Sequence, residues 1–265
     1  MIDMEKNKDE SVSIILPCVG HDMRLKSPYS KELVKINEDM SIIDYSFNHI
    51  LASHIKPRVI VIIEPYKFDT VRYLYEKYND KVNLVFIFQK TNYEGVTGAI
   101  KSAEHLFGDK NILLMPNTII GRKDKEVPLL DKIVEVLDHH PFVFISKDET
   151  SVIRLKSGGA LHVEDGKVID YKNKPLSHVE RYNALLVSFG FKKEVFAEVI
   201  SVIGQGTLKR ANPKNGFRKS IMYKSSTVKV TECIDINTWT KLNAYLLRQY
   251  LVRSGIDPQL LRIYQ

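Results

Sequence analysis

The sequence has few of the features that mark secreted or membrane proteins. Two cysteines, Cys18 and Cys233, occur in 265 residues, which excludes a disulfide scaffold and favours a reducing, cytoplasmic location. No apolar run approaches the ~20 residues that a membrane-spanning helix requires, so no membrane partner is expected. Residues 1–10 are polar and mixed in charge, unlike a signal peptide, and are expected to form a disordered tail.

Concentrated positive charge is also missing, although the chain is basic. Its net charge is +7, from 39 Lys and Arg against 32 Asp and Glu, but no run of five or six basic residues occurs. This scatter, without an RNA-binding aromatic motif, argues against a nucleic-acid partner. It leaves a solvated basic surface or small phosphorylated ligands. The sequence also lacks a serine nucleophile elbow and the His-Glu-x-x-His spacing of a zinc protease.

The first half of the chain alternates short aliphatic runs with helical patterns. Strands are predicted at Val12–Leu16, Val59–Ile63, Leu84–Phe88, Ile112–Met115 and Phe142–Ile145. Helices are predicted at Ser41–Ile55, with Ser41 as its N-cap, and at Phe68–Tyr78, Val96–Phe107 and Leu129–Leu137. Because the strands are apolar throughout, both sheet faces should be covered. The pattern predicts an α/β fold with a mainly parallel, doubly wound sheet.

The pattern changes near residue 150. Two predicted strands flank Glu164-Asp165-Gly166-Lys167, where Asp-Gly indicates a hairpin turn. A further strand at Ala184–Phe191, a helix at Val195–Val202, a strand at Thr227–Val230 and a closing helix at Thr238–Tyr250 follow. We therefore expect a single domain over 11–265. It would comprise a nucleotide-binding half at 11–150, a small antiparallel insert at 151–235 and C-terminal helices at 236–265.

A phosphate-binding site is predicted directly after the first strand. Gly20 lets main-chain N–H groups approach an anion, while Arg24 and Lys31 would neutralise its charge. Ligands of open parallel sheets bind beyond the carboxyl ends of the strands. Polar residues stand at three further predicted strand ends, namely Gln89, Asn117 and Asp235. We expect these strand ends to converge on one site.

An ordered set of short motifs carries a specific resemblance. The segments are Gly20-His21-Asp22-Met23-Arg24, Ser30-Lys31-Glu32-Leu33, Gln89 with Gly95-Val96-Thr97-Gly98-Ala99, Pro116-Asn117-Thr118, Asn173-Lys174-Pro175, Tyr182-Asn183-Ala184 and Asp235-Ile236-Asn237-Thr238. In order and spacing they resemble the motifs of the sugar-1-phosphate nucleotidylyltransferases, which have a glycosyltransferase-A-like fold. The match runs from about residue 11 to 250.

The resemblance implies an enzyme, a nucleotidyltransferase of the sugar-phosphate type. A pyrimidine nucleoside triphosphate, with UTP or dTTP favoured, would give its nucleotidyl group to a sugar 1-phosphate. Pyrophosphate would leave and a nucleotide sugar would form, with Mg²⁺ as cofactor and the insert at 151–235 binding the sugar. Relatives of this kind are often oligomers, so a homo-oligomer is expected by analogy.

The resemblance also implies roles at the nucleotide end of the site. Arg24 would hold the triphosphate and offset charge as pyrophosphate departs, and Lys31 would hold the α-phosphate region. These two are the expected catalytic residues. Gly20 would contact the phosphates. Gln89 would hydrogen-bond the base, and Gly95 would let the backbone approach it, a pairing that can select a pyrimidine.

At the acceptor end, Lys174 would bind the sugar phosphate and Asn183 would contact sugar hydroxyls. Asn117 and Asp235 would bind the metal. Structural alternatives exist for three of these residues. Lys174 is also suited to flank a hairpin, Asn183 to a turn, and Asp235 to capping the helix that follows it.

Some positions depart from the family pattern. Asp22 replaces the second glycine of the phosphate loop, Asn117 the first metal-binding aspartate, and Asn173 the sugar-binding glutamate. Two hypotheses therefore remain. A divergent enzyme would bind Mg²⁺ largely through Asp235 and the phosphates of the nucleotide. Alternatively, a catalytically impaired relative would bind a nucleotide sugar and regulate a partner. The sequence leaves the sugar and the pyrimidine open.

Overall fold

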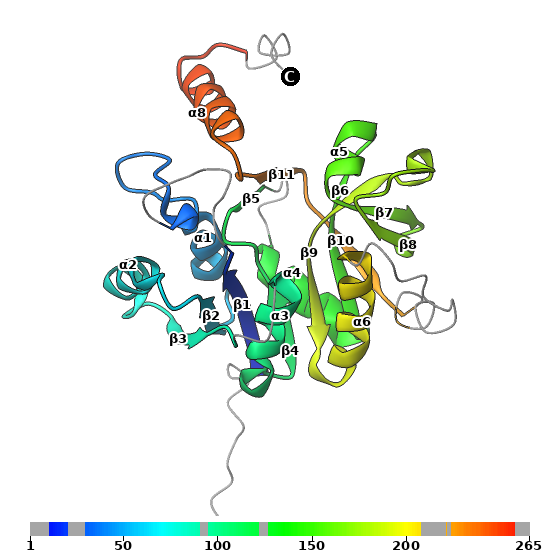
Figure 1. The fold of residues 1–265 in the computed structure, drawn as a ribbon, viewed down its shortest axis with the longest axis horizontal. Coiled ribbons are helices and arrows are strands. Elements are labelled where there is room, and N and C mark those ends of the chain that lie inside the picture. Colours follow the sequence, from blue (N-terminus) through cyan, green and yellow to red (C-terminus); the bar gives the residue numbers. More distant parts are fainter. Residues whose placement is uncertain are drawn as a thin grey trace, which may run out of the picture.

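The computed structural model describes residues 11–20, 30–90, 95–121, 127–207, 221 and 224–257 (Figure 1). The predicted tail at 1–10 and Arg24 lie outside these residues. Within them, the main path of the large sheet has the strand order β10-β6-β9-β4-β1-β2-β3. Strand β7 pairs with β9, and β8 pairs with β7.

One half of this sheet is parallel, as the sequence predicts. Its strands are β1 (Val12–Cys18), β2 (Arg58–Ile63), β3 (Asn83–Phe88) and β4 (Lys110–Leu113). Strand β1 pairs in parallel with both β2 and β4, and all of its residues are buried. A strand paired and covered on every side can be apolar throughout, which explains the unbroken aliphatic run.

Helices cover both faces of the sheet, which confirms the doubly wound α/β class. They are α1 (Asp44–Ala52), α2 (Phe68–Tyr78), α3 (Gly95–Ser102), α4 (Leu129–His139) and α6 (Phe196–Thr207). One core includes Phe47 of α1 and Leu130 of α4, and the other includes Ile100 of α3 and Val199 of α6. The prediction that Ser41 caps α1 is wrong. The side chain of Asp44 instead accepts a hydrogen bond from the Ser41 backbone N–H at 2.8 Å.

The other half of the sheet is mixed. It contains β6 (Phe142–Asp148), β7 (Gly159–Glu164), β8 (Lys167–Asn173), β9 (Ala184–Lys192) and β10 (Ser226–Lys229). Strand β9 is antiparallel to β4, β6 and β7, whereas β10 is parallel to β6. Asp165 and Gly166 join β7 to β8 with φ of 48° and 74°, as the Asp-Gly signal predicts.

Three elements were not anticipated as such. Helix α5 (Val152–Ser157) precedes β7, and β5 (Thr118–Gly121) pairs with β11 (Glu232–Asp235) in a separate two-stranded antiparallel sheet. Helix α8 (Trp239–Arg253) follows β11 and projects from the body of the molecule (Figure 1). Within the described residues, no helix is both long enough and apolar enough to cross a bilayer.

A buried ion pair lies between the start of the chain and α2. The carboxylate of Glu32 is fully buried and accepts hydrogen bonds from Lys67 Nζ at 3.0 and 3.1 Å. The hydroxyl of Thr70 donates a further bond to Glu32 at 2.9 Å. Glu32 belongs to the short 3-10 turn Lys31–Leu33, so the pair fixes the backbone that carries Lys31.

Replacing Lys67 with Met is expected to lower the free energy of unfolding by about 3–5 kcal/mol. The reason is that Glu32 would be left as a buried charge without a cation. Urea denaturation measures this change. The matched control is Lys132→Met, because Lys132 and its partner Glu135 are exposed at the surface and such pairs contribute about 0–1 kcal/mol. Equal losses of unfolding free energy in the two variants would show that the buried pair stabilises the fold no more than an exposed pair does.

Candidate active site

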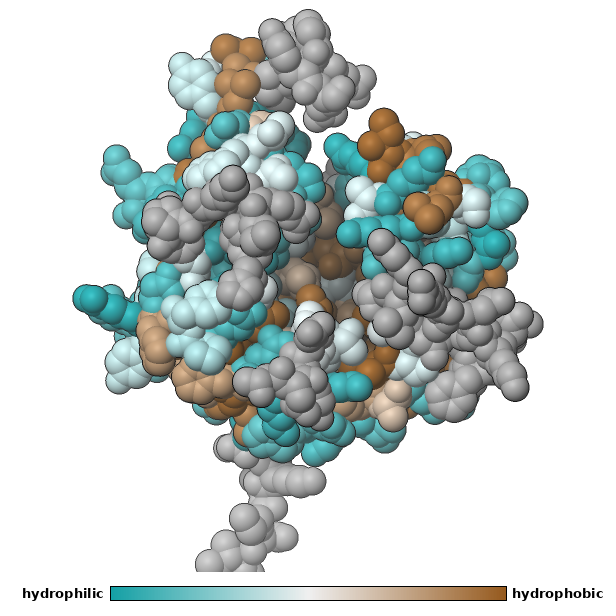
Figure 2. Space-filling view, viewed as in Figure 1, coloured by the Kyte–Doolittle hydropathy of each residue, from teal (hydrophilic) through white to brown (hydrophobic). Residues whose placement is uncertain are grey.

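A hollow opens between two parts of the molecule. Figure 2 shows it between the side that carries α8 and the side that carries α5, β7 and β8, with apolar surface at its depth and hydrophilic surface on its walls. Strand β11 reaches this opening from the α8 side, and the carboxyl end of β6 reaches it from the other side. The hollow is therefore the place to examine the predicted site residues.

Gly20 and Lys31 lie together beyond the carboxyl end of β1. Gly20 has φ of +96°, and a Cβ built on it would lie 4.0 Å from Lys31 Nζ. The backbone N–H of Gly20 donates to Glu64 Oε1 at 2.6 Å. A carboxylate thus holds the donor that a phosphate would need, so a phosphate binding there must displace Glu64. Arg24, the third residue of the predicted phosphate-binding site, lies outside the described residues.

Two further ionisable groups, Tyr66 and Cys18, lie close to the residues around Gly20 and Lys31. Burial, followed by the hydrogen bond to Glu64, raises the pKa of the Tyr66 phenol. Burial also raises the pKa of the Cys18 thiol, with a smaller contribution from Glu32, while Lys31 and Lys67 act in the opposite direction. Both tyrosine and thiol therefore remain neutral near pH 7, and the lysines provide the positive charge here.

Gln89 and Gly95 also meet. The backbone N–H of Gln89 extends the β2–β3 ladder by donating to Ile63 O at 2.9 Å. Its side-chain Nε2 donates to Gly95 O at 3.4 Å, and Gly95 begins α3 with φ of +63°. The Gln89 side chain is partly exposed, so it can exchange this long bond for one with a ligand. The sequence-predicted pair is thus adjacent in the structure.

Asn117 and Asp235 are in direct contact, although 118 positions separate them in the chain. Asn117 Nδ2 donates to Asp235 Oδ1 at 2.7 Å, and the Ile236 N–H donates to Asn117 O at 2.9 Å. Asp235 does not cap α8. Thr238 is the N-cap, and its hydroxyl accepts a bond from the Lys241 N–H at 3.2 Å.

These residues do not fit a divalent cation held by the protein alone. Asp235 Oδ1 accepts from Asn117, and Oδ2 accepts from the side-chain amide of Asn237. The ammonium of Lys241 lies 3.7 Å from Oδ2. Mg²⁺ requires oxygen ligands, whereas Asp235 here faces nitrogen donors and a cation. No group of three or more His, Cys, Asp and Glu side chains suited to a metal occurs in the described residues.

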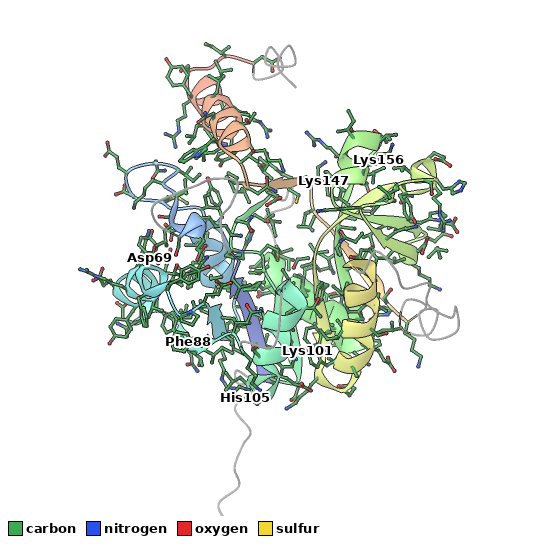
Figure 3. All side chains as sticks on the ribbon, in the orientation of Figure 1. Asp69, Phe88, Lys101, His105, Lys147 and Lys156 are labelled. Atoms are coloured by element: carbon green, nitrogen blue, oxygen red, sulfur yellow. The ribbon has the colours of Figure 1, made fainter. Side chains whose placement is uncertain are left out.

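The opposite wall supplies cations that the sequence analysis missed. Burial and then the Asp235 charge raise the pKa of the Cys233 thiol to about 11, while Lys147 of β6 and Arg154 of α5 oppose this shift. Both cations are thus within electrostatic range of β11, and Figure 3 shows Lys147 beside it. Lys147 Nζ pairs with Glu149 Oε2 at 3.2 Å. The available signal was a lysine two residues after the end of the predicted strand Phe142–Ile145.

Lys174 and Asn183 lie in the β7–β9 region. Lys174 follows β8 with φ of +49°, and its ammonium makes no hydrogen bond or ion pair with another described residue. The Asn183 side chain pairs with the backbone of Val163 in both directions, at 2.9 and 2.8 Å. The amide of Asn183 therefore serves the strand. No hydrogen bond or ion pair within the described ranges joins Lys174 or Asn183 to Asp235.

The comparisons with known proteins identify the family of the chain. A family model described as nucleotidyl transferase matches residues 24–239. The chain belongs to the nucleotidyl transferase family. This membership confirms the predicted enzyme class and, at the level of the family, the resemblance. A comparison with curated proteins found no match.

Solved structures share the fold. One is a protein from Bacillus anthracis described as a glucose-1-phosphate thymidylyltransferase, in complex with sucrose; it is 15% identical, with a TM-score of 0.69, covering 89% of this chain and 94% of that one. Another is a UDP-glucose pyrophosphorylase with UDP-glucose, 14% identical, also with a TM-score of 0.69, covering 91% and 99%. At these identities the likeness shows the fold alone, and it confirms the predicted architecture.

Gly20→Ala is expected to lower the free energy of unfolding by about 1–3 kcal/mol, because a side chain is strained at a φ of +96°. Thermal or urea unfolding measures this loss. Gly158→Ala is the matched control, since Gly158 has a negative φ of −133° and its added Cβ would meet Leu185 at an ordinary 3.6 Å. A Gly20→Ala protein as stable as this control would contradict the assigned backbone conformation.

Proposed function

We propose that the protein transfers a nucleotidyl group from a pyrimidine nucleoside triphosphate, UTP or dTTP, to a sugar 1-phosphate, releasing pyrophosphate. The product is a nucleotide sugar. Membership of the nucleotidyl transferase family supports the reaction class. The observation that carries the proposal is the contact between Asn117 and Asp235, two residues next to strands that meet despite the 118 positions between them in sequence. The two solved structures are described as a thymidylyltransferase and a UDP-glucose pyrophosphorylase, which supports a pyrimidine as the base of the nucleotide.

The reaction is an in-line displacement. An oxygen of the sugar phosphate forms a bond to the α-phosphorus, the bond from this phosphorus to the bridging oxygen breaks, and pyrophosphate carries the electron pair away. The protein contributes positioning and charge stabilisation. Gly20 and Lys31 would hold the phosphates, and Arg24 would offset the charge on the departing pyrophosphate. Binding would exchange the Glu64 carboxylate for a phosphate at the Gly20 N–H.

Specificity would arise at two places. The partly exposed amide of Gln89 and the backbone at Gly95 would hydrogen-bond to the edge of the base. Lys174 would bind the acceptor phosphate, since its ammonium has no partner among the described residues that it would have to leave. Asn183 would contact the sugar only by giving up its two bonds to Val163. These roles correspond to the proposed division into a nucleotide-binding half at 11–150, a sugar-binding insert at 151–235 and C-terminal helices at 236–265.

Mg²⁺ would enter as part of the substrate, chelated by the triphosphate. When bound there, it neutralises phosphate charge. This route agrees with a site in which Asp235 supplies the carboxylate and Asn117 does not add a second one. The cytoplasmic location, the homo-oligomer and the absence of a nucleic-acid partner stay predictions.

A second function is favoured by one observation. Asn117 stands where the resemblance implies an aspartate, and the neighbouring carboxylate is already paired. A relative with such a site would bind a nucleotide sugar without turnover and regulate a partner protein.

The two functions are separated by measuring pyrophosphate release with UTP, dTTP or CTP, a panel of hexose 1-phosphates and Mg²⁺. Release with UTP or dTTP is expected. Lys31→Met should lower the rate by roughly 100-fold, because a charge that stabilises the transition state is lost. Lys132→Met, which removes an exposed lysine on α4, should leave the rate unchanged.

The opposite result would support the regulator. No pyrophosphate with any pair of substrates, together with measurable binding of a nucleotide sugar by calorimetry, would overturn the enzymatic proposal. Release with CTP alone would keep the reaction and correct the base.

A further inference from the structure

Asp235 carries the one carboxylate of a site that the family pattern would build with two. Its neighbours are the amides of Asn117 and Asn237 and the ammonium of Lys241, at 3.7 Å. Together these four side chains have no net charge. A pair of aspartates without the lysine would carry two negative charges, which is the usual basis for attracting a divalent cation.

We propose that Lys241 supplies, from within the chain, the positive charge that a protein-held divalent cation would supply beside Asp235. The free protein then has no divalent-cation site at Asp235. Its carboxylate is instead kept in place by a lysine and two amides. The only divalent cation in the reaction is the one that the triphosphate carries.

The position of Lys241 in its helix supports this role. The Thr238 hydroxyl accepts the Lys241 N–H, so this residue lies in the first turn of α8. Positive charge is disfavoured at a helix N-terminus, because the backbone N–H groups there already carry partial positive charge. Lys241 therefore does not help α8 to form, and its nearest acid is Asp235, which explains the placement.

The orientation of the Asn117 side chain also supports the proposal. Its nitrogen, and not its oxygen, faces Asp235 at 2.7 Å, and the residue is 7% exposed. The backbone carbonyl of Asn117 also accepts from the Ile236 N–H at 2.9 Å, which fixes the backbone of Asn117 beside Asp235. Lys147 and Arg154 add positive charge from the other wall of the hollow. The three side chains that contact the carboxylate thus offer it nitrogen donors and positive charge, and not further oxygen ligands for a metal ion.

The test is a titration of the full-length protein with Mn²⁺, without nucleotide or sugar, in which electron paramagnetic resonance measures free Mn²⁺. Four proteins are compared, namely the wild type, Lys241→Met, Asn117→Asp and the double variant. Each single change should raise Mn²⁺ affinity by on the order of tenfold, the size of effect expected when a neighbour of a metal ligand changes. The double variant should bind more tightly than either.

Two controls assign the effect to this carboxylate. Asp235→Asn added to the double variant should abolish the new binding, whereas in the wild type it should change nothing. Lys241→Arg keeps the positive charge and should leave Mn²⁺ binding as weak as in the wild type. Lys241→Gln replaces Lys241→Met if circular dichroism shows that the methionine variant does not fold.

A wild-type protein that binds one Mn²⁺ and loses it on Asp235→Asn would overturn the inference. So would a double variant that binds no better than the wild type. The inference rests on the proposed function only for the identity of the site. Because the titration contains no substrate, its failure is distinct from a failure to release pyrophosphate.

Discussion

The site depends on the parallel pairing of β1 with a strand on each side. Because β2 and β4 run in the same direction as β1, their carboxyl ends lie at one edge of the sheet. The aliphatic residues of β1 are buried on both faces, and this burial of apolar surface stabilises the register. Gly20, Gln89 and Asn117 are then delivered to the same side of the molecule by three different connections.

Much of this framework was predictable, since periodicity depends on local sequence. The strands, their helices and the Asp165-Gly166 hairpin follow from apolar patterns and turn chemistry. The paired strands β5 and β11 have four residues each and no alternation long enough to recognise. The pairing of Asn183 with Val163, and the approach of Lys241 to Asp235, are tertiary contacts between separate segments. Sequence spacing does not predict such contacts, so the sequence suggests candidate site residues but not the partners that they have in the structure.

In the ligand-free structure, acidic side chains pair with several of the donors and cations near the hollow. Glu64 holds the Gly20 N–H, Glu149 holds Lys147 and Arg154, and Asp235 holds Lys241. Each of these groups is therefore paired before any ligand arrives. Binding of an anionic substrate is an exchange of hydrogen bonds and ion pairs, and its net free energy is the difference between two well-paired states. Such a site favours ligands that replace all of the lost partners, which is a source of selectivity.

Strand β9 has a mechanical consequence. Its Ala184 end pairs with β7 of the insert, and its Lys192 end pairs with β4 of the nucleotide-binding half. Strand β6 pairs with β9 along its whole length, and the register shifts once, between Ile145 and Ser146. The two sides of the hollow thus share strand β9, and a hinge motion between them would have to break hydrogen bonds of the sheet. The width of the hollow is therefore set by the sheet.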